Sequence, residues 1–255
     1  MLTPVDLHTH STASDGTLSP AALMRRARDQ GVEEIALTDH DTVDGLEEAA
    51  RAARELGLRF VPGIELSVDW RHHTLHIVGL EIDPQGPALK SLMQRLAEMR
   101  TRRARSIGAR LDKLGYTGAY AGACRLADCI RPGRAHFARY LAKKGRVKNE
   151  GDAFKRLLGR GKPAYVATAW PAMATAIHAI HDAGGWSVLA HPLRYQLTAT
   201  KVREAVAEFK AAGGAGLEIV NGRQTQGETD RLERLAQRHE FRPSRGSDFH
   251  SPPHD

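Results

Sequence analysis

The chain has 255 residues, of which 41% are hydrophobic and 26% charged, so wholesale disorder and collagen-like repeats are excluded. No apolar run reaches the roughly 18 residues needed to span a bilayer, and the first residues lack the basic and apolar regions of a secretory signal. Two cysteines cannot form a disulfide framework. We therefore expect a cytoplasmic protein without a membrane partner, built as one large domain or as one domain with an insertion.

Strands and helices alternate over the first 80 residues. Ser19 is a good N-cap and Pro20 suits the first helical position, while Gly31 supplies a left-handed stop. A second helix, rich in Ala, Glu and Arg, is expected to end near Gly57. The predicted strands of this part are residues 5–8, 35–38, 60–64 and 75–80. Such an alternation indicates parallel βα units.

The alternation stops after the fourth predicted strand. Residues 89–162 have a helical pattern without a convincing strand, and strands are then predicted at 186–190, 217–220 and 242–247. The last of these is polar and contains Pro243, which favours an edge strand. The sequence thus predicts an α/β fold of seven strands, with residues 1–88 and 163–255 forming a barrel and residues 89–162 a helical insertion.

Positive charge is concentrated in the insertion. Residues 95–162 contain 19 Lys or Arg against 5 Asp or Glu, whereas the rest of the chain is acidic on balance. A basic segment within an acidic body suggests an anionic partner for that segment. A solvated helix face is the alternative that charge alone leaves open.

Histidine and carboxylate side chains recur where the predicted strands end. A single His-x-His pair or one histidine on a strand is more often accidental, but a joint pattern over six strand ends is not. In a barrel of parallel strands these ends converge on one mouth. His and carboxylate ligands suit zinc, manganese or iron. The candidate ligands are His8, His10, Asp15, His40, Glu65, His76, His191, Asp248 and His250.

Five ordered motifs resemble those of the PHP family, the polymerase and histidinol phosphatase domain of metal-dependent phosphoesterases. The motifs are Asp6-Leu7-His8-Thr9-His10-Ser11, Leu37-Thr38-Asp39-His40-Asp41, Pro62-Gly63-Ile64-Glu65, Ala190-His191-Pro192 and Gly246-Ser247-Asp248-Phe249-His250. The resemblance spans nearly the whole chain and implies a distorted (β/α)7 barrel. The insertion before Gly161-Lys162-Pro163 resembles the branch with nucleoside 3′,5′-bisphosphate phosphatases and 5′-to-3′ exoribonucleases.

The resemblance implies two to three divalent ions, manganese first, with iron or zinc as alternatives. It assigns one ion to His8, His10, Glu65 and Asp248, a second to Glu65, His76 and His191, and a third to Asp15, His40 and His250. His191 and His250 are candidates for protonating the leaving group. Asp39, next to His40, is expected to orient a ligand.

The expected activity is hydrolysis of the 3′-side phosphate ester of 5′-phosphorylated nucleotides, either nucleoside 3′,5′-bisphosphates or short RNA. The predicted substrate-binding residues are Arg134, His136, Lys162 and Arg194, because cationic groups on short loops suit phosphate. The alternatives are a small-metabolite phosphatase of the histidinol phosphatase type and a non-catalytic barrel that binds nucleic acid. No stable protein partner is inferred.

Overall fold

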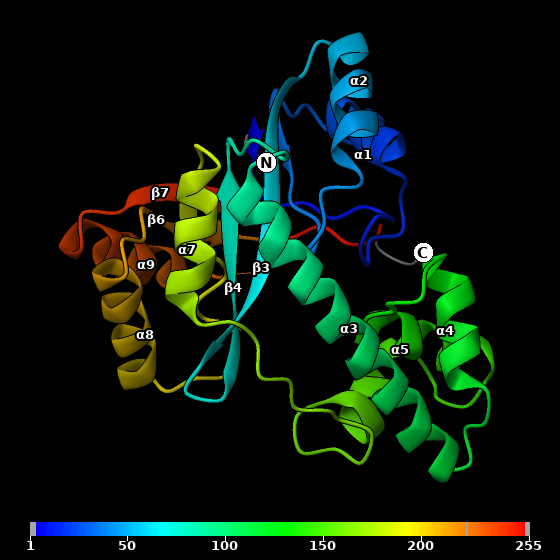
Figure 1. The fold of residues 1–255 in the computed structure, drawn as a ribbon. Helices are drawn as coiled ribbons and strands as arrows, with labels where there is room; N and C mark the ends of the chain where they lie inside the picture. Colours follow the sequence, from blue (N-terminus) through cyan, green and yellow to red (C-terminus); the bar gives the residue numbers. More distant parts are fainter. Residues whose placement is uncertain (1–3, 223, 253–255) are drawn as a thin grey trace. The chain divides into compact units, whose positions relative to one another are not determined.

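The computed structural model, drawn in Figure 1, describes residues 4–222 and 224–252. The strands among them form one sheet in sequence order. Strands β1 to β3 pair in parallel, and so do β5 to β7, whereas β4 is antiparallel to both of its neighbours. The strands are β1 (Val5–Asp6), β2 (Glu34–Leu37), β3 (Arg59–Trp70), β4 (His73–Leu80), β5 (Trp186–Leu189), β6 (Gly216–Asn221) and β7 (Arg242–Gly246).

The first and last strands meet, so the sheet curls into a barrel. The Leu7 amide donates to the Arg245 carbonyl at 2.9 Å, and the Asp248 amide donates to the His8 carbonyl at 2.8 Å. The predicted distorted (β/α)7 barrel is confirmed, and so is the strand expected at 242–247, which is β7, the last strand in the order of the sheet. The polar strand is accommodated because its buried residues, Ser244 and Gly246, are small.

The expectation of parallel units fails at the third and fourth strands. Strand β3 does not end near Ile64 but continues to Trp70, and it forms an antiparallel hairpin with β4. The two residues between these strands, Arg71 and His72, have φ of 48° and 63°. Positive φ at both central residues is the conformation of a type I′ hairpin turn. Glu65 therefore lies within a strand rather than at its end.

The helices of the barrel unit begin and end where local sequence dictates. The Ser19 hydroxyl accepts a hydrogen bond from the Ala22 amide, and Gly57 closes the second helix with φ of 68°. Helices α1 and α2 lie side by side (Figure 1). The helices are α1 (Pro20–Asp29), α2 (Leu46–Leu56), α3 (Pro87–Lys113), which continues into the second unit, α7 (Met173–Asp182), α8 (Ala199–Ala211) and α9 (Gln226–Arg238).

The chain divides into two compact units, one of Met1–Met93 with Trp170–Asp255 and the other of Gln94–Ala169. The second unit packs its own apolar core, which includes Ile107, Leu111, Phe137 and Leu158. All of residues 94–169 are described, and none is in a strand. Its further helical elements are α4 (Ala119–Ala127), α5 (Arg134–Lys143), α6 (Glu150–Ala153) and the π-helical turn Phe154–Leu158.

The length and apolar character of its helices determine whether a chain can cross a membrane. Across residues 4–222 and 224–252, no helix combines the length and apolar character required to cross a bilayer.

Candidate metal centre

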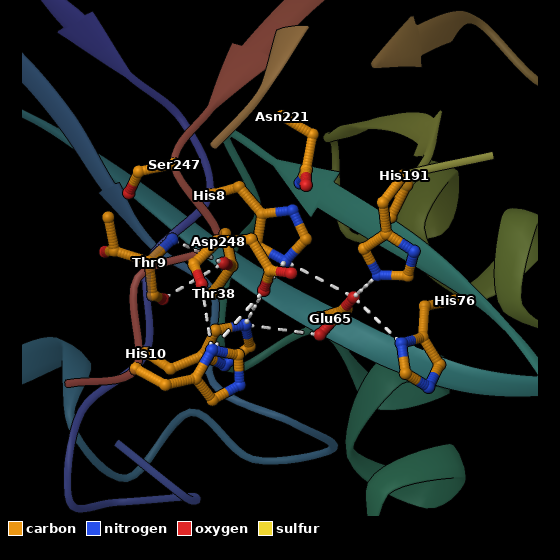
Figure 2. Close-up of polar contacts among 12 residues, drawn as sticks. His8, Thr9, His10, Thr38, Glu65, His76, His191, Asn221, Ser247 and Asp248 are labelled. Carbon is orange, nitrogen blue, oxygen red and sulfur yellow. Dashed lines mark hydrogen bonds and ion pairs between the residues drawn. The ribbon is translucent and has the colours of Figure 1, made fainter. Parts of the chain in front are cut away.

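The nine predicted ligands lie together at one end of the barrel, brought there by segments that are far apart in the sequence. Figure 2 labels six of them, namely His8, His10, Glu65, His76, His191 and Asp248. Backbone hydrogen bonds align these segments. The His10 amide donates to the Phe249 carbonyl at 2.9 Å, and the Asp41 amide donates to the Glu65 carbonyl at 2.9 Å. His191 and Asp248 have φ of 28° and 53°, a left-handed conformation that is uncommon outside glycine and clusters at functional sites.

Glu65 is the centre of the cluster, and its side chain is fully buried. Burial raises the pKa of the Glu65 carboxyl, but the nearby histidines outweigh this effect and hold the pKa well below its usual range. Its oxygens face nitrogens of several histidines in Figure 2. The distances are 2.8 Å to His40 Nδ1, 3.0 Å to His76 Nδ1, 3.0 Å to His191 Nε2, 3.3 Å to His8 Nε2 and 3.4 Å to His10 Nε2.

A second part of the cluster surrounds Asp15. Its Oδ1 lies 3.3 Å from His250 Nε2 and 3.9 Å from His40 Nε2. Burial lowers the pKa of His250, but the Asp15 carboxylate outweighs this effect and raises the pKa to about 9. Burial, with positive charge on His250, lowers the pKa of His10 to about 3. Neighbouring histidines therefore differ sharply in their affinity for a proton.

Asp248 connects these two parts. Its Oδ1 lies 3.4 Å from His10 Nε2, 3.6 Å from His8 Nε2 and 3.5 Å from His250 Nδ1. Burial raises the pKa of the Asp248 carboxyl, but the adjacent histidines, His8 above all, bring it below its usual range. Its other oxygen accepts a hydrogen bond from Arg194 Nη1 at 3.3 Å. Arg194, whose side chain is 42% exposed, is thus joined to the cluster at the side open to solvent.

The donor set fits divalent metal ions. His8 Nε2, His10 Nε2 and Glu65 Oε2 are buried and make no hydrogen bond of acceptable geometry with the described residues, although they face one another. Buried polar atoms left in this way are costly, and a cation among them satisfies several lone pairs at once. In each of four groups the ligand atoms lie within 4.8 Å of one another, namely His10, Asp15, His40 and His250; His8, Glu65 and His191; His8, His10 and Asp248; and His40, Glu65 and His76.

Hydrogen bonds to the Asp39 carboxylate hold the loop after β1. The Asp39 carboxylate is buried and accepts hydrogen bonds from the Ser11 amide at 2.8 Å, the Ser11 hydroxyl at 2.6 Å and the Ser14 hydroxyl at 2.5 Å. Ser14 Oγ lies 3.5 Å from His10 Nδ1. Through these hydrogen bonds Asp39 holds the loop that follows His10, and the carboxylate is turned toward this loop and not toward the adjacent His40.

Sequence reasoning missed two side chains behind the cluster. Glu218 is buried in β6, and its Oε1 lies 2.9 Å from His8 Nδ1. The Tyr195 hydroxyl donates to the Ala190 carbonyl at 2.8 Å and accepts from the His76 amide at 2.9 Å. The signal for Glu218 was available, because a lone carboxylate interrupts the apolar run Leu217–Val220 of a buried strand.

The other predicted substrate-binding residues belong to the Gln94–Ala169 unit. Arg134 and His136 lie in the first turn of α5 rather than on a loop. The Arg134 guanidinium lies 5.7 Å from the Phe154 ring centre and 5.8 Å from that of Tyr165. His136 is buried, and its Nδ1 accepts a hydrogen bond from the Gly133 amide at 3.1 Å. Lys162 is exposed.

Comparison with known proteins now gives the class of this chain. The PHP domain matches residues 6–160. The chain is 48% identical to the 5′-3′ exoribonuclease of Haemophilus influenzae over 247 residues, which cover 97% of this chain and 90% of that protein. It is 43% identical to the 3′,5′-nucleoside bisphosphate phosphatase of Chromobacterium violaceum over 249 residues, 97% of this chain and 87% of that one.

A solved structure is also similar to this chain in both sequence and fold. It is an amidohydrolase from Chromobacterium violaceum with bound sulfate and no metal, and it matches with a TM-score of 0.95 and 42% identity over 98% of this chain and 89% of its own. The chain therefore belongs to the PHP family, and the resemblance seen in its motifs is confirmed.

Proposed function

We propose that this protein is a metal-dependent phosphoesterase that hydrolyses the 3′-side phosphate ester of 5′-phosphorylated nucleotides. Its substrates are nucleoside 3′,5′-bisphosphates and short RNA, taken in the 5′-to-3′ direction. The observation that carries the proposal is the convergence of nine His, Asp and Glu side chains on one end of the barrel. The names of the two relatives support the choice of substrates.

The cluster is proposed to hold about two to three divalent ions, Mn²⁺ first, with Fe²⁺ or Zn²⁺ as alternatives. Glu65 is the shared ligand of two proposed sites. Its oxygens lie 3.3 Å and 3.4 Å from the Nε2 atoms of His8 and His10 in one site. They lie 3.0 Å from His76 Nδ1 and from His191 Nε2 in the other. When bound, such ions activate water at neutral pH and neutralise charge on the phosphate oxygens. Asp15, Glu65 and Asp248 bring fewer negative charges than the ions bring positive ones, so the loaded centre attracts a phosphate.

Residues at the edge of the cluster complete the proposed site. Arg194, tied to Asp248, presents further N–H donors to a phosphate oxygen. His191 and His250 are the proposed proton donors to the leaving oxygen, and His250 is the more accessible, with a side chain 30% exposed against 9% for His191. A nitrogen that binds an ion cannot also carry the proton, so His250 donates only while its Nε2 is not a ligand.

The Gln94–Ala169 unit is proposed to bind the 5′-phosphorylated end, through Arg134 and Lys162. Its excess of basic side chains supports this role. The unit also contains a cavity of about 370 Å³ whose lining has two phenol rings, two cationic side chains and no carboxylate. The lining residues are Tyr116, Thr117, Tyr140, Leu141, Lys144 and Arg146. His136 is the weakest of the predicted substrate ligands, because it is buried and its Nδ1 accepts a hydrogen bond from the Gly133 amide.

The test is phosphate release from 3′-phosphoadenosine 5′-phosphate and from histidinol phosphate, each with and without Mn²⁺. The proposal predicts Mn²⁺-dependent release from the bisphosphate and little from histidinol phosphate. Preference for histidinol phosphate would instead identify a small-metabolite phosphatase. No release from either substrate would identify a non-catalytic barrel.

A further inference from the structure

A buried carboxylate outside the nine predicted ligands connects two of them. Glu218 lies on β6, at the point where the pairing of β6 with β7 shifts register. Its side chain is 2% exposed. Gly246 of β7 makes room for it, since a Cβ at that position would meet His8 Cβ at 2.2 Å and Glu218 Oε1 at 3.0 Å. Strand β7 is thus shaped to let this carboxylate reach the His8 ring.

The two oxygens of Glu218 have different partners. Oε1 accepts from His8 Nδ1 at 2.9 Å. Oε2 accepts from the His191 amide at 2.5 Å and from Asn221 Nδ2 at 3.0 Å. His8 follows β1 and His191 follows β5, so one carboxylate ties together two strand ends that are far apart in the sequence. The His191 bond also holds a backbone with φ of 28°.

The hydrogen bond to Oε1 determines which nitrogen of His8 can act as a ligand. A carboxylate only accepts, so in the neutral ring, the form that binds a metal ion, Nδ1 carries the hydrogen and Nε2 keeps its lone pair. His8 Nε2 is the atom that faces the other candidate ligands, 3.3 Å from Glu65 Oε1 and 3.6 Å from Asp248 Oδ1. A partner on the far nitrogen commonly sets the tautomer and orientation of a ligating histidine.

We propose that Glu218 is a positioning residue that holds His8 in the tautomer with Nε2 free to bind an ion and fixes the backbone that presents His191. This proposal rests on the metal centre of the proposed function. It predicts a specific failure in Glu218→Gln. Two N–H donors, from His191 and Asn221, meet at the Oε2 position and select the amide oxygen there. The amide NH₂ then faces His8 Nδ1 and donates to it, which moves the ring hydrogen to Nε2.

The test measures Mn²⁺ binding by isothermal titration calorimetry, without substrate. We expect Glu218→Gln to weaken binding by about 10- to 100-fold at the site that uses His8. Asn221→Ser, which removes a different partner of the same carboxylate oxygen, is the matched control and should change binding by less than about threefold. Thermal unfolding of the metal-free variants identifies loss of fold. Wild-type Mn²⁺ affinity in a folded Glu218→Gln protein would overturn the proposal.

A second measurement needs no variant. In the Zn²⁺-loaded wild-type protein with ¹⁵N-labelled histidine, long-range ¹H–¹⁵N spectra distinguish the two tautomers. The proposal requires a hydrogen on Nδ1 of His8, and a hydrogen on Nε2 would contradict it. Neither measurement uses turnover, so inactivity toward 3′-phosphoadenosine 5′-phosphate would count against the proposed substrate and leave the role of Glu218 to be decided by binding and spectra.

Discussion

The two compact units handle their charged side chains in opposite ways. In the barrel unit, histidines and carboxylates are packed against one another, and the Glu65 side chain has no exposed surface. In the Gln94–Ala169 unit, the core is apolar and basic side chains such as Lys144, Arg146 and Lys162 are exposed. A buried polar cluster is costly unless it has a purpose, whereas exposed charge is nearly free. Roles can be proposed for the buried side chains of the barrel one by one, whereas most exposed basic side chains of the Gln94–Ala169 unit contribute only to the charge of its surface.

The largest expected effect comes from removing the charge at the centre of the buried cluster. Glu65→Gln leaves five surrounding histidines without their shared carboxylate, and breaking a buried charged contact typically costs about 3–5 kcal/mol. We expect kcat/KM for 3′-phosphoadenosine 5′-phosphate to fall by about 10²- to 10⁴-fold and the Mn²⁺ content to fall with it.

Glu55→Gln is the matched control, because this glutamate is exposed on α2. It should keep both activity and metal content. A Glu65→Gln variant that binds Mn²⁺ and turns over like the wild type would place the ions elsewhere.

The next prediction concerns the exposed charge of the second unit. Losing one charge-assisted contact costs roughly 1.5–3 kcal/mol, or about 10- to 100-fold in catalytic efficiency. Lys162→Ala and Arg134→Ala should lower kcat/KM by this factor for the 3′,5′-bisphosphate and hardly at all for adenosine 3′-monophosphate. Lys162→Ala is the cleaner test, because Arg134 also lies over the rings of Phe154 and Tyr165.

Lys113→Ala, at the exposed end of α3, serves as the control for a general loss of positive charge. If both substrates lose activity equally in the Arg134 and Lys162 variants, these side chains support the fold or the metal centre and do not read the 5′-phosphate.

The smallest expected effect is on salt dependence. Each phosphate neutralised by the basic unit adds about 0.7 to the slope of log affinity against log salt for a single strand. The KM for a short 5′-phosphorylated oligonucleotide should therefore rise more steeply with NaCl than the KM for the mononucleotide. Equal slopes would show that the basic side chains form only a solvated face.

The barrel and its cluster were predictable because their determinants are local. The Ser19-Pro20 start and the Gly57 stop specify helices, and the position of a side chain just after a buried strand specifies its place at the mouth. His8, His40 and His191 were found in this way. The order of the strands follows from short connections between consecutive elements.

Other features depend on pairing between strands and could not be deduced so directly. Glu65 marked the apparent end of a strand, although the alternation through Leu66, Val68 and Trp70 was a signal that the strand continued. The strand at β7 was predicted, but its polar sequence did not show that backbone hydrogen bonds join it to the segment after β1, where the Leu7 amide donates to the Arg245 carbonyl. Glu218 was missed because its partner, His8, is 210 residues away.

The basic character of the insertion was predictable from the sequence, but the surroundings of its individual side chains were not. Its charge excess was evident from composition, but charge alone does not distinguish Lys162, which is exposed, from Arg134, which is partly enclosed by aromatic rings. His136 resembled a phosphate ligand and proves to be buried with its ring bonded to the Gly133 amide.

The most direct test of the metal centre is the metal content of the wild-type protein. The protein would be expressed with added Mn²⁺, purified without chelator and analysed for all first-row transition metals against protein concentration. We predict about two to three ions per chain, bound mainly as Mn²⁺. Less than one ion per chain would contradict the account, because the buried side chains around Glu65 would then have to be satisfied in some other way.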